Sequence, residues 1–183
     1  MKQHYLLIIF ILFTVSLEAQ IVEIPDANFK GRLIELGKDI NGDGEIQTSE
    51  AEAVTTLYLT WPYSINSIEG IRNFTNIRSL YLAFQPIDNV DVSGLLFLEE
   101  LDMPSNALTL DASGCTSLNT LRSFYEIESI NVSGCTSLTD LNISSSSLST
   151  IDFEGCLNME NIYINSSNLS GIRYYGPTCN TVF

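Results

Sequence analysis

The sequence predicts an α/β solenoid, with a parallel β-sheet on the concave face, an extended or irregular convex side and a short helix-loop-helix N-terminal cap. Two observations lead to this fold class. Apolar residues recur with a period of 20 to 21 residues from about residue 54 onward, and each recurrence contains a Leu-x-Leu alternation typical of a strand. Repeats of this length build solenoids, in which neighbouring coils bury one continuous core.

The repeat places apolar residues in three aligned columns. In the most regular coil these columns hold Leu98, Leu101 and Leu108. The other coils supply Ile77, Leu118, Leu138 and Met159 to the first column, Leu80, Leu121, Leu141 and Ile162 to the second, and Ile87, Ile127, Leu148 and Leu169 to the third. We assign about six coils to residues 54–183.

Residues 1–19 have the features of a secretory signal peptide. Lys2 gives a positive start, an apolar run extends from Tyr5 to Val15, and cleavage is expected after Ala19. The apolar run is too short for a membrane-spanning helix, although a retained N-terminal anchor is the alternative interpretation. We therefore expect a secreted or cell-surface protein that does not insert into a membrane after cleavage.

Residues 20–53 are predicted to form the N-terminal cap. A first helix is expected within residues 21–37, begun at Asp26 and ended at Gly37. A second helical turn is expected near Ser49, where Ser49 and Glu52 have the spacing of a capping box.

Between these helices, residues 39–50 match the calcium loop of an EF-hand. Calcium binds hard oxygen ligands, and such a loop supplies them at fixed positions, with a glycine at the sharp turn. The candidate ligands are Asp39, Asn41, Asp43, the backbone carbonyl of Glu45, Gln47 and a closing Glu50. The alternative is a surface turn that binds nothing, because Asp, Asn and Gly favour turns in any case. A structural calcium ion is the expected cofactor.

The composition excludes several classes of function. The formal net charge is −14 with only 8 Lys and Arg residues, so the protein repels phosphate backbones and nucleic acid is not an expected partner. The single histidine, His4, lies in the predicted signal peptide. Without histidine the mature chain lacks the usual general base and the commonest zinc ligand. We therefore expect that the protein is not an enzyme and has no catalytic residues.

The repeats over residues 54–172 resemble those of leucine-rich repeat proteins, whose signature is Leu-x-x-Leu-x-Leu-x-x-Asn/Cys-x-Leu. The calcium-loop entry, with Ile24-Pro-Asp-Ala-Asn-Phe29 before it, further resembles secreted leucine-rich repeat proteins of Bacteroidetes-type bacteria. The sequence departs from the family pattern in the fourth coil. That coil lacks one residue before Ile127 and has Ser123 where an apolar residue is expected, so we expect a local distortion there.

Four cysteines in a secreted chain first indicate disulfides. However, Cys115, Cys135, Cys156 and Cys179 share a repeat position with Phe74 and Leu95. A column that also accepts Phe and Leu is a core column, so buried free thiols are predicted. A bridge between Cys156 and Cys179 is the alternative.

Aromatic residues gather at outward positions of the first coils, and Phe124 and Tyr125 form a second group. The candidate ligand-binding residues are Tyr58, Trp61, Tyr81, Phe84, Phe124 and Tyr125. Exposed aromatic clusters anchor protein partners, and flat rings also suit sugar faces. Alternatively, tyrosine has a high strand propensity and stacks across neighbouring strands without binding anything.

Two functions from different classes remain. The first is a secreted or cell-surface module that binds a protein or a glycan on its concave face. The second is a structural or adhesive segment of a larger surface assembly, with no specific ligand of its own.

Overall fold

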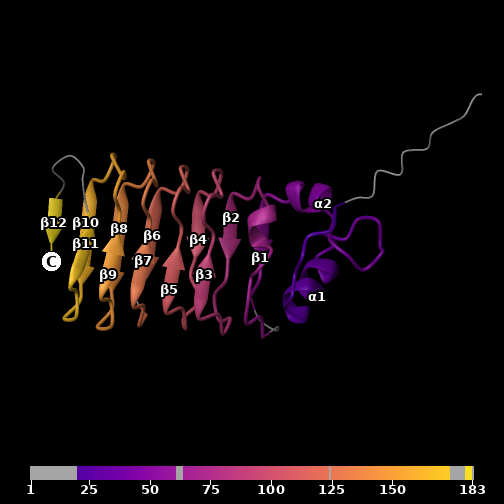
Figure 1. The fold of residues 1–183 in the computed structure, drawn as a ribbon, viewed down its shortest axis with the longest axis horizontal. Coiled ribbons are helices and arrows are strands. Elements are labelled where there is room, and N and C mark those ends of the chain that lie inside the picture. The colour runs from indigo at the N-terminus through magenta and orange to yellow at the C-terminus, as the bar shows by residue number, and fades with distance from the viewer. Residues whose placement is uncertain (1–19, 61–63, 124, 174–179, 183) are drawn as a thin grey trace, which may run out of the picture.

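The computed structural model describes residues 20–60, 64–123, 125–173 and 180–182. The chain forms a β-solenoid whose parallel strands stack along one axis, with the N-terminal segment at one end and the last strand at the other (Figure 1). Helices are few: α1 (Ala27–Glu35), α2 (Thr48–Glu52) and the 3-10 helix η1 (Ile71–Asn73). In the described ranges, none of these helices has the length and apolar character needed to cross a membrane. The predicted signal peptide lies outside the described residues.

The Leu-x-Leu alternation forms one side of the solenoid, which we call the first side. Its strands are β1 (Thr56–Tyr58), β2 (Ser79–Tyr81), β4 (Glu100–Asp102), β6 (Thr120–Ser123), β8 (Asp140–Ser144), β10 (Asn161–Asn165) and β12 (Asn180–Val182). All pair in parallel, and the register matches the repeat, for example Leu57 with Leu80 and Leu80 with Leu101. The predicted parallel sheet is thus confirmed, with one interruption between β4 and β6.

The opposite side, which we call the second side, was predicted to be extended or irregular, and the structure shows extended strands there. It carries a five-stranded parallel sheet of β3 (Asn89–Asp91), β5 (Thr109–Asp111), β7 (Ser129–Asn131), β9 (Thr150–Asp152) and β11 (Gly171–Arg173). The reason is a second alternation in each coil, such as Val90-x-Val92 and Ile130-x-Val132, whose apolar members are buried. Two alternating segments in each coil build two sheets.

A polar turn follows β3, β5, β7 and β9 of the second sheet and repeats from coil to coil. Asp91 and Asp111 each accept the backbone N–H two residues later, at 2.9 Å between N and Oδ1. A glycine with positive φ comes next, with values of 77° at Gly94, 73° at Gly114, 74° at Gly134 and 80° at Gly155. Only glycine adopts this left-handed conformation without strain, so it is required at this position of the turn.

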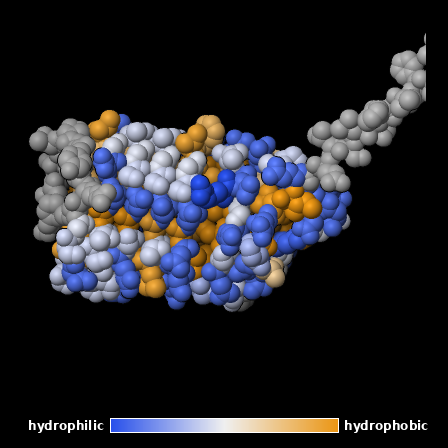
Figure 2. Space-filling model, in the orientation of Figure 1, coloured by the Kyte–Doolittle hydropathy of each residue, from blue (hydrophilic) through white to orange (hydrophobic). Residues whose placement is uncertain are grey.

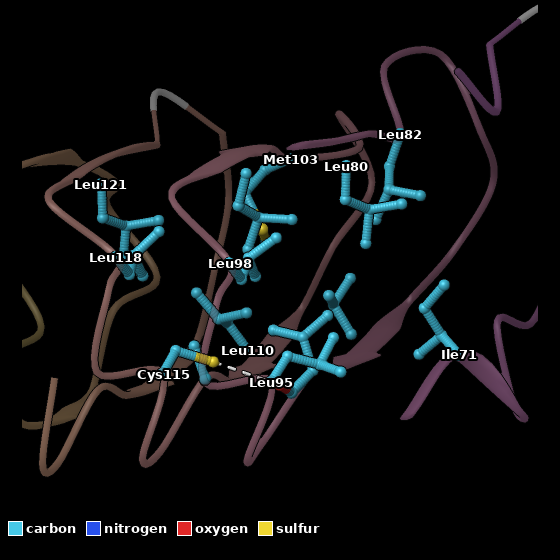
Figure 3. Packing of buried hydrophobic residues seen from close by; sticks show 14 of the residues in the cluster. Ile71, Leu80, Leu82, Leu95, Leu98, Met103, Leu110, Cys115, Leu118 and Leu121 are labelled. Carbon is cyan, nitrogen blue, oxygen red and sulfur yellow. Dashed lines mark hydrogen bonds between the residues drawn. The ribbon is translucent and has the colours of Figure 1, made fainter. Parts of the chain in front are cut away.

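Side chains from both sheets fill the space between them in rows along the solenoid, as Figure 3 shows for Leu80, Leu98, Leu118 and their neighbours. The described cysteines Cys115, Cys135 and Cys156 are buried free thiols, as predicted. Each Sγ donates to a carbonyl oxygen of the preceding coil, at 3.2 Å from Cys115 to Val92 (Figure 3). Burial raises the pKa of Cys115 and of Cys156 to about 11. Cys156 is unbridged, and Cys179 lies outside the described residues.

The N-terminal segment packs against the first coil. Phe29 and Leu33 of α1 are fully buried, and the Phe29 ring lies 6.4 Å from the Phe74 ring, centroid to centroid. Helix α1 begins at Ala27 and is capped by Asp26, as predicted, with Asp26 Oδ1 accepting the Phe29 N–H at 3.0 Å. The preceding residues are extended instead: Ile21 forms an antiparallel bridge with Gln47. The N-terminal segment is thereby joined to the end of the loop that connects α1 to α2.

Candidate functional sites

The acidic loop, residues 39–50, connects α1 to α2 and is held by its own carboxylates. Asp39 accepts the N–H groups of Gly42 at 2.7 Å and of Gly44 at 2.9 Å, one with each oxygen. Glu50 is only 5% exposed, and its Oε1 accepts the Ile40 N–H at 2.7 Å. These bonds fix the positions of both ends of the loop.

The start of α2 differs from the prediction in its capping residue. Gln47 is the N-cap, and Glu50 Oε2 accepts the Gln47 backbone N–H at 2.9 Å. The capping pair is therefore Gln47 and Glu50 rather than Ser49 and Glu52. Glu50 fixes the loop to the helix that follows it, because its two oxygens accept N–H groups from opposite ends of the loop.

The middle of the loop brings three candidate ligands into contact. Asp43 Oδ2 accepts an N–H from the Asn41 side chain at 2.9 Å and another from the Gln47 side chain at 2.7 Å. The backbone N–H of Glu45 and these amides lower the pKa of Asp43. The Glu45 carboxylate forms an ion pair with Lys30, which is compatible with a backbone role for Glu45 in the loop.

The donor set consists of carboxylate and amide oxygens, the ligand types that calcium prefers. The arrangement fits less closely: within the described parts of the chain, no group of three or more His, Cys, Asp and Glu residues is placed to hold a metal ion. Asn41 and Gln47 direct their NH₂ groups toward Asp43. A cation beside Asp43 requires these amides to rotate so that their oxygens replace the NH₂ groups.

Among the aromatic candidates, the structure brings together Tyr58 and Tyr81. They are register partners on β1 and β2, and their rings stack with centroids 4.6 Å apart and an angle of 2° between the planes. Tyr58 is 55% exposed. The Tyr81 hydroxyl donates to Glu100 Oε2 at 2.6 Å, and this hydrogen bond raises the pKa of Tyr81. One face of each ring is covered by the other ring.

The remaining aromatic candidates lie apart from this pair. Phe84 is 76% exposed in the turn after β2, with a φ of 65°. Among the described side chains it makes no ring contact with either stacked tyrosine. Tyr125 is exposed in the turn after β6. Trp61 and Phe124 lie outside the described residues.

An open cavity of about 390 Å³ lies beside the tyrosine pair, at the interruption between β4 and β6. We call it the β4–β6 crevice; it is lined by Tyr81, Glu99, Glu100, Leu101, Asp102, Asn119, Thr120 and Arg122. The sequence analysis did not select Glu100 and Asp102. Their position in the repeat could have identified them. Glu100 and Asp102 occupy the same outward positions on β4 as Ser79 and Tyr81 occupy on β2.

The interruption adjoins the fourth coil, where the sequence predicts a distortion. Ser123 is 4% exposed at the end of β6, where neighbouring coils place buried Met103 and Ile143. The two departures from the repeat, a smaller inward side chain at Ser123 and one residue fewer before Ile127, thus lie in the coil whose strand β6 does not pair with β4. In comparisons with known proteins, no protein-family model and no curated protein matches this chain.

Proposed function

We propose that this protein is a secreted or cell-surface leucine-rich repeat protein that binds a protein or glycan ligand on the outer face of β1, β2 and β4. The observation that carries the proposal is the stacked pair of Tyr58 and Tyr81 beside the β4–β6 crevice. Large aromatic side chains that remain exposed next to a concave surface are favoured anchors for partners. The proposed role is non-enzymatic.

The geometry of the pair favours a protein ligand over a glycan. A sugar ring packs on an open aromatic face, but in this pair the tyrosines cover one face of each other. A carboxylate adjoins the pair instead, because Glu100 Oε2 accepts a hydrogen bond from the Tyr81 hydroxyl. Polar and charged groups around an aromatic anchor are typical of protein interfaces.

A structural or adhesive segment without its own ligand is the second candidate. The same stack supports it, because cross-strand tyrosine pairs stabilise a sheet without any partner. Side-chain ladders along the surface have the same effect, for example Asn161 Nδ2 donating to Asp140 Oδ1 at 2.7 Å. A binding experiment separates these two functions.

The proposal includes a structural calcium ion in the acidic loop and a capping role for residues 20–53. Asp39, Asn41, Asp43, Gln47 and Glu50 would hold the ion with their side chains, and Glu45 with its backbone carbonyl. The ion supplies positive charge among clustered carboxylates and thereby stabilises the loop between α1 and α2. The loop is joined to the N-terminal strand segment, with Val22 N–H donating to the Ile46 carbonyl at 2.8 Å.

The direct test screens residues 20–183, in calcium, on a glycan array and on an array of purified extracellular proteins. Tyr58→Ala and Tyr81→Ala are compared with Tyr163→Ala, an exposed tyrosine on β10 away from the pair. Loss of a signal with the first two variants and its retention with the third supports the binding function. Binding that is indifferent to all three variants, or the absence of any ligand, favours the structural segment.

A further inference from the structure

The fourth coil pairs with its predecessor on one side of the solenoid and not on the other. On the second side, β5 and β7 are paired in full register, with Leu110 opposite Ile130. On the first side, β4 and β6 belong to the same two coils yet form no parallel pair. Figure 1 shows them as neighbours in the stack. The β4–β6 crevice therefore lies where the parallel pairing of the first side is interrupted, between two strands that remain neighbours.

The backbone of β4 indicates what faces this opening. Asp102 and Glu100 direct their backbone groups toward β2, since the Asp102 carbonyl accepts the Leu82 N–H at 2.9 Å and the Glu100 N–H donates to Arg78 at 3.0 Å. Alternation along a strand then turns the N–H and C=O of Leu101 toward β6, outside any sheet ladder. Leu101 is 8% exposed, whereas Leu80 and Leu121 in the same column are fully buried.

Carboxylates line the rim of the crevice, and one of them lacks a partner. Glu99 forms an ion pair with Arg78, and Glu100 accepts the Tyr81 hydroxyl. The Asp102 carboxylate has no hydrogen bond or ion pair with any described residue, and no ion pair joins it to Arg122 on the opposite strand, although both residues line the crevice. Partial burial of Asp102 by its neighbours raises its pKa. The Asp102 side chain is exposed, so an incoming cation can reach this unpaired carboxylate and stabilise its charge.

We propose that the β4–β6 crevice binds an arginine side chain presented by an extended segment of a partner protein. The guanidinium has five N–H donors and a flat face. Asp102 and Glu100 accept from it, the Leu101 carbonyl offers a further acceptor, and the Tyr81 ring forms a wall beside it. The net charge of −14 attracts a basic partner at long range. This inference rests on the proposed binding function and names its partner class.

The test is a titration of residues 20–183 with a blocked Gly-Arg-Gly-Arg-Gly peptide, followed by calorimetry and by amide chemical shifts. The double variant Asp102→Asn with Glu100→Gln is compared with the double variant Asp88→Asn with Glu128→Gln. Both remove the same charge, but Asp88 and Glu128 are exposed next to β3 and β7 on the second side. A peptide with citrulline in place of arginine keeps the shape without the charge.

We expect the crevice variant to weaken binding about tenfold and the matched control to weaken it less than about twofold. Shifts are expected at Leu101 and Arg122, and the citrulline peptide is expected not to bind. Equal weakening by both double variants, shifts confined to other coils, or no binding of the arginine peptide overturns the inference. A ligand from the array screen that still needs Tyr58 and Tyr81 leaves the proposed function standing in that case.

Discussion

Asp26 Oδ2 accepts the backbone N–H of Ser67 at 3.0 Å, across 41 residues of sequence. The same oxygen accepts the Asn66 N–H at 2.8 Å, while Oδ1 caps α1 through the N–H groups of Asn28 and Phe29. One carboxylate therefore fixes both the start of the first helix and a loop of the first coil. The attachment of the N-terminal segment to the solenoid depends on this side chain.

Replacing Asp26 removes both functions at once. We expect Asp26→Ala to lower the free energy of unfolding by about 2 to 3 kcal/mol, since an N-cap contributes about 1 kcal/mol and hydrogen bonds to a charged acceptor contribute about 1.5 kcal/mol or more. Chemical denaturation followed by circular dichroism measures this. Asp26→Asn, which keeps one acceptor oxygen, serves as the control and should cost less. Equal stability of Asp26→Ala and the wild type would contradict the bonding described.

The stability of the protein should also depend on pH through Asp26. Burial raises the pKa of Asp26, but the N–H donors of Phe29, Asn66, Ser67 and Asn28 outweigh burial, and the folded-state pKa lies below 3.8. The stabilisation is therefore fully present above the unfolded-state pKa and is lost as the pH falls through the lower folded-state value. The free energy of unfolding of the wild type should exceed that of Asp26→Asn by a constant amount from neutral pH down to about pH 4. Below about pH 4 this difference should shrink. A constant difference down to the acid limit would count against this account.

Gly70 marks where the N-terminal strand segment passes over the first coil. Its φ is 98°, and a Cβ there would lie 2.5 Å from the Glu23 carbonyl oxygen. Gly70→Ala should therefore destabilise the protein by about 2 kcal/mol or more and expose residues 20–26 to hydrogen exchange.

The matched control for Gly70 is Gly31, inside α1, where a Cβ has no atom within 4 Å. Gly31→Ala should stabilise the protein by about 0.5 to 1 kcal/mol through helix propensity. Thermal melts of both variants measure the contrast. Similar effects of the two substitutions would show that the contact with Glu23 is not important.

The calcium hypothesis predicts a rise in the thermal midpoint when calcium replaces a chelator. Because a ligand that binds only the folded state stabilises it by mass action, the rise should grow with calcium concentration in the range of about 10⁻⁴ to 10⁻³ M. Glu50→Ala should abolish the calcium-dependent rise, and Glu52→Ala, in the exposed turn of α2, should retain it. The informative quantity is the difference between the thermal midpoints in calcium and in chelator for each variant. The midpoint of Glu50→Ala alone is not informative, because this substitution also removes hydrogen bonds to backbone N–H groups. Identical midpoints in calcium and in chelator would rule out the site.

Half of the solenoid was predictable from the sequence because one pattern specifies it strongly. Leu80, Leu101 and Leu121 recur at a fixed interval within an alternating segment, and such a pattern determines which side of a strand is buried. The second sheet was not predicted because four of its strands, β3, β5, β7 and β9, end in Asp or Asn three residues before a Gly. These residues indicate turns when considered alone. The buried Val90 and Val92 were the available signal.

The candidate sites show the same limit. The oxygen ligands of the acidic loop were identified from their spacing, but the spacing does not reveal that Asn41 and Gln47 direct their amides toward Asp43. The sequence indicated a distortion in the fourth coil. The position of the β4–β6 crevice depends on how two neighbouring coils pack against each other. No pattern within one coil specifies that packing. Tyr58 lies against Tyr81 because the β1–β2 register places the two residues opposite each other. The sequence around Tyr58 does not specify this register.

The glycine turns of the second side have a consequence for how the protein tolerates insertions. A Cβ on Gly134 would lie 3.7 Å from the Cα of Gly114, and one on Gly155 would lie 3.5 Å from that of Gly134, so each turn rests on the one before it. Inserting a whole coil adds one strand spacing of about 4.8 Å on both sides and preserves every contact of this kind. Inserting a single residue inside one of these turns moves its glycine out of the column and forces a side chain into a left-handed backbone. Single-residue changes of length are therefore confined to the rest of the coil, where the spacing between glycines is 20 residues from Gly114 to Gly134 and 21 from Gly134 to Gly155.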